Sequence, residues 1–215
     1  MPDQRLLIDN DAFIILAGTD LLTEALSVLG YTPEQALRLA ALPHMLGKSK
    51  QLKARYPADI ITKAGAACDQ IPALKDREGD PEVFERLINA HDDLNDGEAL
   101  MLTVAVERHG YSVLTGDRRA LVAFGQAPGL DDLRLTLANR LVCLEILLRL
   151  LAEKLGVDKL SACLASLIPV HQSLKVFFSA GCQADHSQCF VALNTYFGAL
   201  RTEVGASLLL NPFLD

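Results

Sequence analysis

The sequence predicts an α/β fold, a three-layer α/β/α sandwich around a mostly parallel central sheet, with further helices at its C-terminal end. Two observations lead to this prediction. Short apolar runs typical of strands alternate with segments of helical spacing, in the order strand, helices, strand, helix, strand. The chain has 215 residues, of which 50% are hydrophobic, and this is enough to bury a full core in one domain.

The first predicted strand is LLIDNDAFII, residues 6–15. It is an apolar run that also carries two carboxylates, Asp9 and Asp11. A second β-rich run, YSVLT at residues 111–115, is followed by GDRRAL, in which Asp117 lies at the turn into a helix. Both predicted strands are therefore followed at once by acidic residues.

Helices are predicted where apolar residues recur at three- and four-residue spacing behind a capping residue or a first-turn proline. The basic segment 45–57 is either a solvated helix face or a strip that faces phosphate, and the polar stretch 73–80 is predicted to be a loop. The predicted helices cover residues 21–29, 32–43 and 81–90, a segment from Asn95 or Asp96 to Gly110, and a segment after Asp117.

Carboxylates are expected to gather at one edge of this sheet. In open parallel sheets, ligands collect outside the carboxyl ends of the strands, and Asp9, Asp11 and Asp117 lie at two such ends. Glu98, in the first turn of the intervening helix, joins them if the two strands are neighbours. Each acid also has an ordinary explanation as a helix cap or first-turn residue, so the hypothesis of a site depends on their joint placement.

Acidic side chains held close together raise one another's pKa, and a divalent cation removes that cost. Mg²⁺ or Mn²⁺ suits a cluster of oxygen ligands, and such ions serve phosphoryl chemistry. The sequence contains no nucleophile elbow, no Walker A loop and no dinucleotide fingerprint. Metal-assisted hydrolysis is therefore the leading prediction.

The composition indicates a soluble, cytoplasmic protein without a membrane segment. No uninterrupted hydrophobic stretch is long enough for a signal peptide or a bilayer span. The formal net charge of −7 disfavours a nucleic-acid partner unless a local basic patch or bridging cations are present. Five cysteines fit reduced core thiols, while Cys182, His186 and Cys189 have the spacing of an incomplete zinc site whose alternative is an ordinary polar loop.

Two of these segments resemble the PIN-domain nuclease family. LLIDNDAFI looks like the opening strand of that family, and DGEALMLTVAVERHGYSVLTGDRRAL, residues 96–121, is similar to its central block. The resemblance implies a PIN-like nuclease domain over residues 1–165, whose last strand and helix come from residues 140–160. Residues 166–215 then form a helical C-terminal extension packed on the same domain.

The resemblance further implies a ribonuclease that uses Mg²⁺ or Mn²⁺, often works as a homodimer and in some members is the toxin of a toxin–antitoxin pair. Carried over by position, Asp9, Glu98 and Asp117 are the catalytic acids, Asp96 is an additional metal ligand, and Asp11 supports the site. Members of the family usually supply another acid after the first strand. This sequence offers Glu24, Glu34 and Asp59 in that region, without a match to the family pattern.

Two other functions stay open. The chain could be a catalytically inactive PIN-like module that binds a protein partner through its apolar C-terminal helices. It could also be a haloacid-dehalogenase-type phosphatase, because DNDAF resembles that superfamily's opening, with Asp9 as nucleophile and Asp11 as acid. Against the phosphatase, TGDRRAL has no second acid shortly after Asp117.

Overall fold

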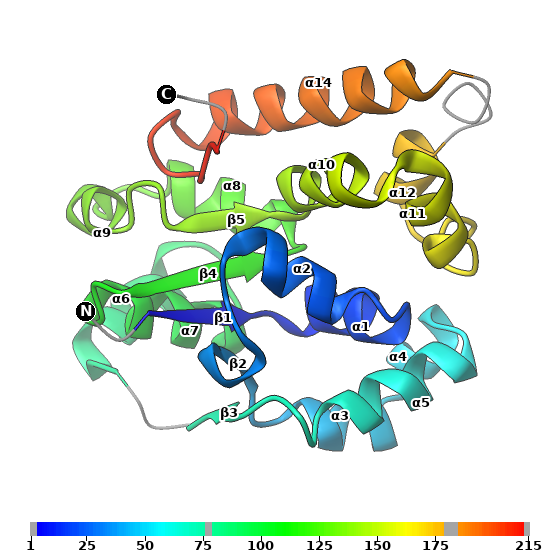
Figure 1. The fold of residues 1–215 in the computed structure, drawn as a ribbon. Helices are drawn as coiled ribbons and strands as arrows, with labels where there is room; N and C mark the ends of the chain where they lie inside the picture. The colour runs from blue at the N-terminus through cyan, green and yellow to red at the C-terminus, as the bar shows by residue number, and fades with distance from the viewer. Residues whose placement is uncertain (1–3, 76–78, 179–184, 213–215) are drawn as a thin grey trace.

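The chain folds around a five-stranded, fully parallel sheet, seen in the computed structural model, which describes residues 4–75, 79–178 and 185–212 (Figure 1). The strand order is β3-β2-β1-β4-β5. This confirms the predicted α/β class and is compatible with three layers. The strands are β1 (Arg5–Ile8), β2 (Ala36–Leu39), β3 (Ala73–Leu74), β4 (Tyr111–Thr115) and β5 (Leu141–Cys143).

The strand order places a topological switch point between β1 and β4. After β1 the chain crosses to β2 on one side, whereas after β4 it crosses to β5 on the other side. The two central strands pair directly, with Ile8 opposite Leu114. Connections that leave neighbouring strands in opposite directions open a crevice at their carboxyl ends, and ligands of parallel sheets bind there.

Two predictions of secondary structure are wrong in detail, one of a strand and one of a helix. The first strand ends at Ile8, and the apolar run continues as helix α1 (Asn10–Gly18), because a fully buried run has no periodicity that separates strand from helix. The helix predicted over 32–43 is a single 3₁₀ turn, Pro33–Gln35, followed by β2. A capping box between Thr32 and Gln35 completes that turn, and pairing with β1 then holds the chain extended.

The other helices that the sequence predicts are present in the structure. Residues 81–90, the segment after Asn95 and the segment after Asp117 are helical as predicted, whereas the predicted loop 73–80 also contains the short strand β3. The helices are α2 (Leu22–Leu29), α3 (Leu42–Lys48), α4 (Lys50–Arg55), α5 (Ala58–Ala67), α6 (Pro81–Ala90), α7 (Asp96–Glu107), α8 (Arg118–Gln126), α9 (Asp131–Thr136), α10 (Leu144–Leu155), α11 (Val157–Leu164), α12 (Gln172–Phe177) and α14 (His186–Val204).

Helices cover both faces of the sheet. In Figure 1, α1 and α2 lie on the viewer's side of the strands, and α6 and α7 lie behind them. Strand residues Leu6, Leu7 and Leu114 are completely buried, as expected when a sheet is covered on both faces. Across the described residues, no single helix is long and apolar enough to cross a membrane; α1 and α2 meet that criterion only as a pair bent by 116°.

The C-terminal helix α14 packs across α8 and α10 (Figure 1). At the crossing with α8 the backbones nearly touch, because a Cβ added to Gly125 would lie 2.5 Å from Cα of Val204. Beyond α14, Leu208 and Leu209 are buried, and Leu209 forms an isolated parallel bridge with Leu141 of β5. Helix α14 and the segment up to Leu209 therefore share the core of the sheet.

Replacing Gly125 with Ala is expected to destabilise the fold by about 1–3 kcal/mol, because the new methyl group would meet backbone atoms that cannot move without separating α8 from α14. Gly198→Ala in α14 is the matched control. A Cβ at Gly198 meets nothing within 4 Å, so this substitution should be neutral or stabilise by up to about 1 kcal/mol. Urea unfolding of both variants measures the difference, and equal stabilities would contradict the close packing.

Candidate functional site

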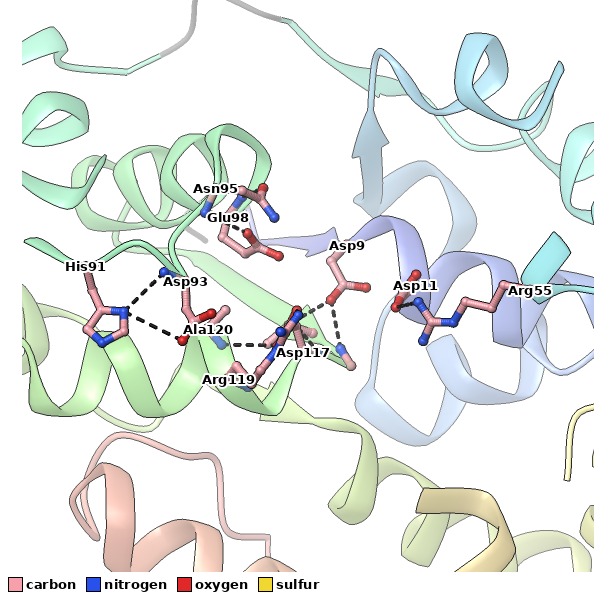
Figure 2. Close-up of polar contacts among 12 residues, drawn as sticks. Asp9, Asp11, Arg55, His91, Asp93, Asn95, Glu98, Asp117, Arg119 and Ala120 are labelled. Atoms are coloured by element: carbon pink, nitrogen blue, oxygen red, sulfur yellow. Dashed lines mark hydrogen bonds and ion pairs between the residues drawn. The ribbon is translucent and has the colours of Figure 1, made fainter. Parts of the chain in front are cut away.

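Three carboxylates face one another at the switch point between β1 and β4 (Figure 2). Asp9 follows β1 directly, Asp117 lies two residues beyond β4, and Glu98 stands in the first turn of α7. Each of the three is bound to a helix N-terminus, and this fixes where its side chain lies. We call Asp9, Glu98 and Asp117 the carboxylate cluster.

Asp9 is the buried centre of the carboxylate cluster, with 4% of its surface exposed. Its Oδ1 accepts a hydrogen bond from the backbone N–H of Ala12 (2.5 Å), which caps α1. Its Oδ2 accepts hydrogen bonds from the Thr115 hydroxyl and from the backbone N–H of Gly116 (2.8 Å). Burial raises the pKa of Asp9 to about 6, although these three hydrogen bonds act to lower it.

Glu98 forms a capping box with Asn95 at the start of α7. Its Oε2 accepts from the backbone N–H of Asn95 (3.1 Å), while Asn95 Oδ1 accepts from the N–H groups of Gly97 (2.9 Å) and Glu98 (3.3 Å). Burial raises the pKa of Glu98 to about 7, and the charges of Asp117 and Asp9 add to the effect. The three acids therefore share one electrostatic environment.

Asp117 caps α8. Its Oδ1 accepts from the N–H groups of Arg119 (2.8 Å) and Ala120 (3.2 Å), and its Oδ2 lies 3.8 Å from an Arg119 guanidinium nitrogen. The hydroxyl of Thr115 connects two acids, because it donates to Asp9 and accepts from the backbone N–H of Asp117 (3.0 Å). About a quarter of the Asp117 side chain, 26%, is exposed, so it forms the wetter side of the carboxylate cluster.

Asp11 lies beside the carboxylate cluster but is paired with a cation. Its Oδ2 accepts from Arg55 (2.7 Å), and its Oδ1 accepts from the Tyr56 hydroxyl (3.3 Å). Burial acts to lower the pKa of Arg55, yet Tyr56, Asp11 and Asp117 together raise it. The negative charge of Asp117 is thus one of the charges that stabilise protonated Arg55. The position of Asp11 fits a supporting role, since it holds Arg55 at the edge of the site.

Asp96, the fourth acid predicted to bind metal, is exposed and lines a groove next to the carboxylate cluster. Among the other acids considered, Glu34 precedes β2, and its carbonyl accepts from Arg5 at the amino end of the sheet, opposite the cluster. Of the incomplete zinc pattern, Cys182 lies outside the described residues, His186 pairs with Asp158 (2.9 Å) and Cys189 is buried.

The carboxylate cluster has the chemistry of a site for a hard divalent cation. Its ligands are all oxygens, its acids repel one another, and no hydrogen bond from the described residues reaches Oε1 of Glu98. Within residues 4–75, 79–178 and 185–212, however, no three Asp, Glu, His or Cys side chains are close enough to hold an ion as they stand. Binding an ion requires side-chain rotation within the cluster.

Basic groups flank the carboxylate cluster at both ends. In Figure 2, Arg55 lies beyond Asp11 on one side, and Arg119 and His91 lie on the other. Arg119 and His91 line a pocket of about 380 Å³ with residues of α8. A polyanion that passes over the cluster would meet a cationic group before and after it.

Sequence reasoning missed the residues that organise the site. Thr115 and Gly116 hold the buried oxygen of Asp9, and the signal for them is a Thr at the last position of a strand followed by Gly-Asp. The sequence indicates Arg55 only as one member of a basic segment and not as the partner of Asp11. Glu145 is also buried, after β5, where burial and the Glu145 charge raise the pKa of the Cys143 thiol well above its usual value.

Comparison of the chain with protein-family models, with curated proteins and with solved structures finds no match. The geometry of the site is therefore the basis on which a function can be proposed.

Glu98→Gln is expected to stabilise the protein at pH 8 and to have little effect near pH 4.5. The pKa of Glu98 is higher in the folded state than its ordinary 4.5, so its favourable contribution is complete below 4.5 and is lost as the pH rises toward about 7. The gain at pH 8 should be about 1 kcal/mol, well below the full shift because part of the side chain contacts water. Gln keeps the acceptor of the capping box.

Urea unfolding at both pH values measures this difference. Asp96→Asn is the matched control, because it removes the same charge from the same helical turn at an exposed position. An Asp96 variant that gains as much stability as the Glu98 variant would contradict a repulsive, partly buried cluster.

Proposed function

We propose that the protein is a divalent-metal-dependent nuclease, with single-stranded RNA as its substrate, and that its scaffold is PIN-like. The observation that carries the proposal is the convergence of Asp9, Glu98 and Asp117 at a topological switch point, with the pKa of two of them raised by burial and by their neighbours. Mg²⁺ or Mn²⁺ would relieve this repulsion.

The three acids would hold the ion once side-chain rotation brings their free lone pairs together. Asp9 and Asp117 cap helices through Oδ1, and Glu98 binds the backbone of Asn95 through Oε2. When bound, the ion supplies a Lewis acid that stabilises charge on phosphate oxygens and lowers the pKa of water. The protein's part is to orient the acids, to bury Asp9 and to position the phosphodiester.

RNA is favoured as substrate by the basic groups on either side of the acids. The net charge of −7 gives no general attraction for a polyanion, so binding must come from local contacts. Arg55 at one end and Arg119 at the other are such contacts, and the helix of Arg55, α4, carries the exposed Lys50 and Lys53 and follows α3 with the exposed Lys48. Arginine forks match phosphate oxygens well.

The phosphatase alternative is disfavoured by the position of Asp9. A nucleophilic carboxylate must reach phosphorus with a free oxygen, whereas Asp9 is 4% exposed and both of its oxygens accept protein hydrogen bonds. Asp11, the proposed acid of that mechanism, is bound to Arg55 instead. Formation of a phosphoaspartate at Asp9 would nevertheless establish the phosphatase.

A binding module without catalysis is the second candidate. It is supported by the finding that the described residues contain no ready-made metal group, and by Val191 on α14, whose side chain is 63% exposed. An apolar side chain on that helix is where a protein partner or a second copy of the chain would dock. In this case the acids of the carboxylate cluster serve only as helix caps.

Saturating Mn²⁺ is expected to raise the melting temperature of the wild-type protein. A concentration of about 100 Kd adds about 2.7 kcal/mol, which corresponds to roughly 5–10 °C for a chain of this size. Asp117→Asn should lose most of this rise and lower kcat/KM for RNA by about 100-fold or more, because a metal supplies several kcal/mol of charge stabilisation. Thermal melts with and without Mn²⁺ and cleavage of labelled RNA measure both effects.

Asp185→Asn is the control for this experiment, because Asp185 also caps a helix by accepting from a backbone N–H (Ser187, 2.9 Å) but lies at the start of α14. It should behave as wild type in both assays. Unchanged melting in Mn²⁺ together with no RNA cleavage would overturn the nuclease proposal and favour the binding module.

Removal of either flanking arginine should weaken RNA binding in a salt-dependent way. For single-stranded RNA, each lost phosphate contact reduces the slope of log K against log salt by roughly 0.7. Arg55→Ala and Arg119→Ala should both show this change, measured by fluorescence anisotropy with labelled RNA over a range of KCl concentrations. Lys63 lies in α5 and pairs with Asp20, so Lys63→Ala should leave the slope unchanged. Equal slopes in all three variants would contradict the proposed path of the RNA.

A further inference from the structure

A large groove opens beside the carboxylate cluster, at the carboxyl ends of β1 and β2. Its volume is about 920 Å³, within the usual range for ligand pockets. Two of its walls are continuous with the acids: Asn10 follows Asp9 in the chain, and the backbone N–H of Asn95 binds the carboxylate of Glu98. Whatever occupies the groove therefore lies next to the chemistry.

The lining of the groove combines an apolar floor with hydrogen-bond acceptors. Leu39, Met45 and Phe84 supply apolar and aromatic surface. Asp96 and Glu85, both exposed, place carboxylates at the rim. The described residues that line it include no Lys, Arg or His, so the groove repels phosphate and is distinct from the basic groups that flank the cluster.

Asn10 adds an acceptor that lacks a partner. Its Oδ1 is buried and makes no hydrogen bond with any described residue, while its amide nitrogen only contacts the sulfur of Met45 at 3.4 Å. A buried polar atom without a partner is uncommon in a stable fold and costs about 1–3 kcal/mol. Because Asn10 lines the groove, rotation of its side chain would bring this oxygen to a ligand that donates a hydrogen bond, and the cost would be removed.

We propose that this groove binds a nucleobase of the substrate, and that it selects bases with an exocyclic amino group over uracil. The inference rests on the proposed function and adds its base preference. A base is planar and neutral, and so fits an apolar floor under an acceptor-rich rim. Adenine and cytosine offer an amino group to carboxylate and amide oxygens, whereas uracil presents a carbonyl oxygen in the corresponding place; guanine carries its amino group at a different position of the ring.

A cationic peptide is the competing occupant, because rim carboxylates also attract Lys and Arg side chains. The base is favoured by the position of the groove. Its walls lead directly to Asp9 and Glu98, so a nucleotide whose phosphate lies over the carboxylate cluster has its base within reach of Asn10 and Asn95. The apolar floor, with Phe84 among its residues, also suits a ring better than an ammonium group.

Cytidine and uridine are the sharpest probes, since they differ at the amino position and carry no phosphate. Their binding does not need the carboxylate cluster or a metal ion, so this experiment can fail or succeed independently of the nuclease proposal. Titrations of the isotope-labelled wild-type protein followed by NMR should show cytidine binding about 5-fold to 100-fold more tightly than uridine, with shifts at Asn10 and Asn95.

Ala41→Trp tests the place of binding. Ala41 is exposed and lines the groove, so an indole there fills the space without touching the cluster. This variant should lose the preference for cytidine, while Ala165→Trp, an exposed position at the end of α11, should keep it. In RNA cleavage, Ala41→Trp should abolish the difference in rate between C-rich and U-rich oligonucleotides.

Three outcomes would overturn the inference. Equal affinities for cytidine and uridine would show that the groove does not read the amino group. A cytidine preference that survives in Ala41→Trp would place the base elsewhere. A Lys-rich peptide that binds and is lost in Ala41→Trp, with no nucleoside binding, would assign the groove to a peptide. In each case, Mn²⁺ protection and RNA cleavage still decide the nuclease proposal separately.

Discussion

The buried carboxylate of Asp9 is the interaction on which the site and the centre of the sheet depend. One side chain joins the end of β1, the start of α1 through Ala12, and the end of β4 through Thr115 and Gly116. The connections diverge at β1 and β4, so this carboxylate lies at the switch point between the two strands. The fold therefore keeps an acid with a raised pKa in its interior.

Helix capping and metal binding are usually opposed explanations of an acidic residue, but in the proposed site the first would prepare the second. Asp9, Glu98 and Asp117 each stand at the start of a helix, where exposed N–H groups and the helix dipole favour negative charge. The caps fix one oxygen of each carboxylate. They thereby bring three acids from distant parts of the chain to one place, against a mutual repulsion that shows in the pKa of Glu98. Thr115 couples two of these caps through a single hydroxyl.

The sequence was most informative where a pattern is local and least informative where pairing decides. The caps at Asn95 and Asp117 and the strand over 111–115 were predictable from a few neighbouring residues. The strand β2 was not, because a proline-initiated turn with a capping box looks like the start of a helix and only pairing with β1 extends it. Arg55 was equally out of reach, since its partner Asp11 is 44 residues away and nothing near either residue indicates the pair. The groove, which draws on four separate segments, leaves no local trace in the sequence.

The basic groups and the groove lie in different places around the acids. This arrangement bears on how an acidic protein could act on RNA. Cations lie at the two ends of the carboxylate cluster, with Arg55 at one and Arg119 at the other, whereas acceptors and apolar groups line the groove at its side. A phosphate would be repelled by the carboxylates of the groove and a base would gain nothing from the arginines beyond stacking, so the two parts of a bound nucleotide would lie in different places. With a net charge of −7, nonspecific affinity for the backbone is low, and base contacts then account for a larger share of the total binding energy. The nuclease that we propose would gain selectivity from this lack of general attraction for its substrate.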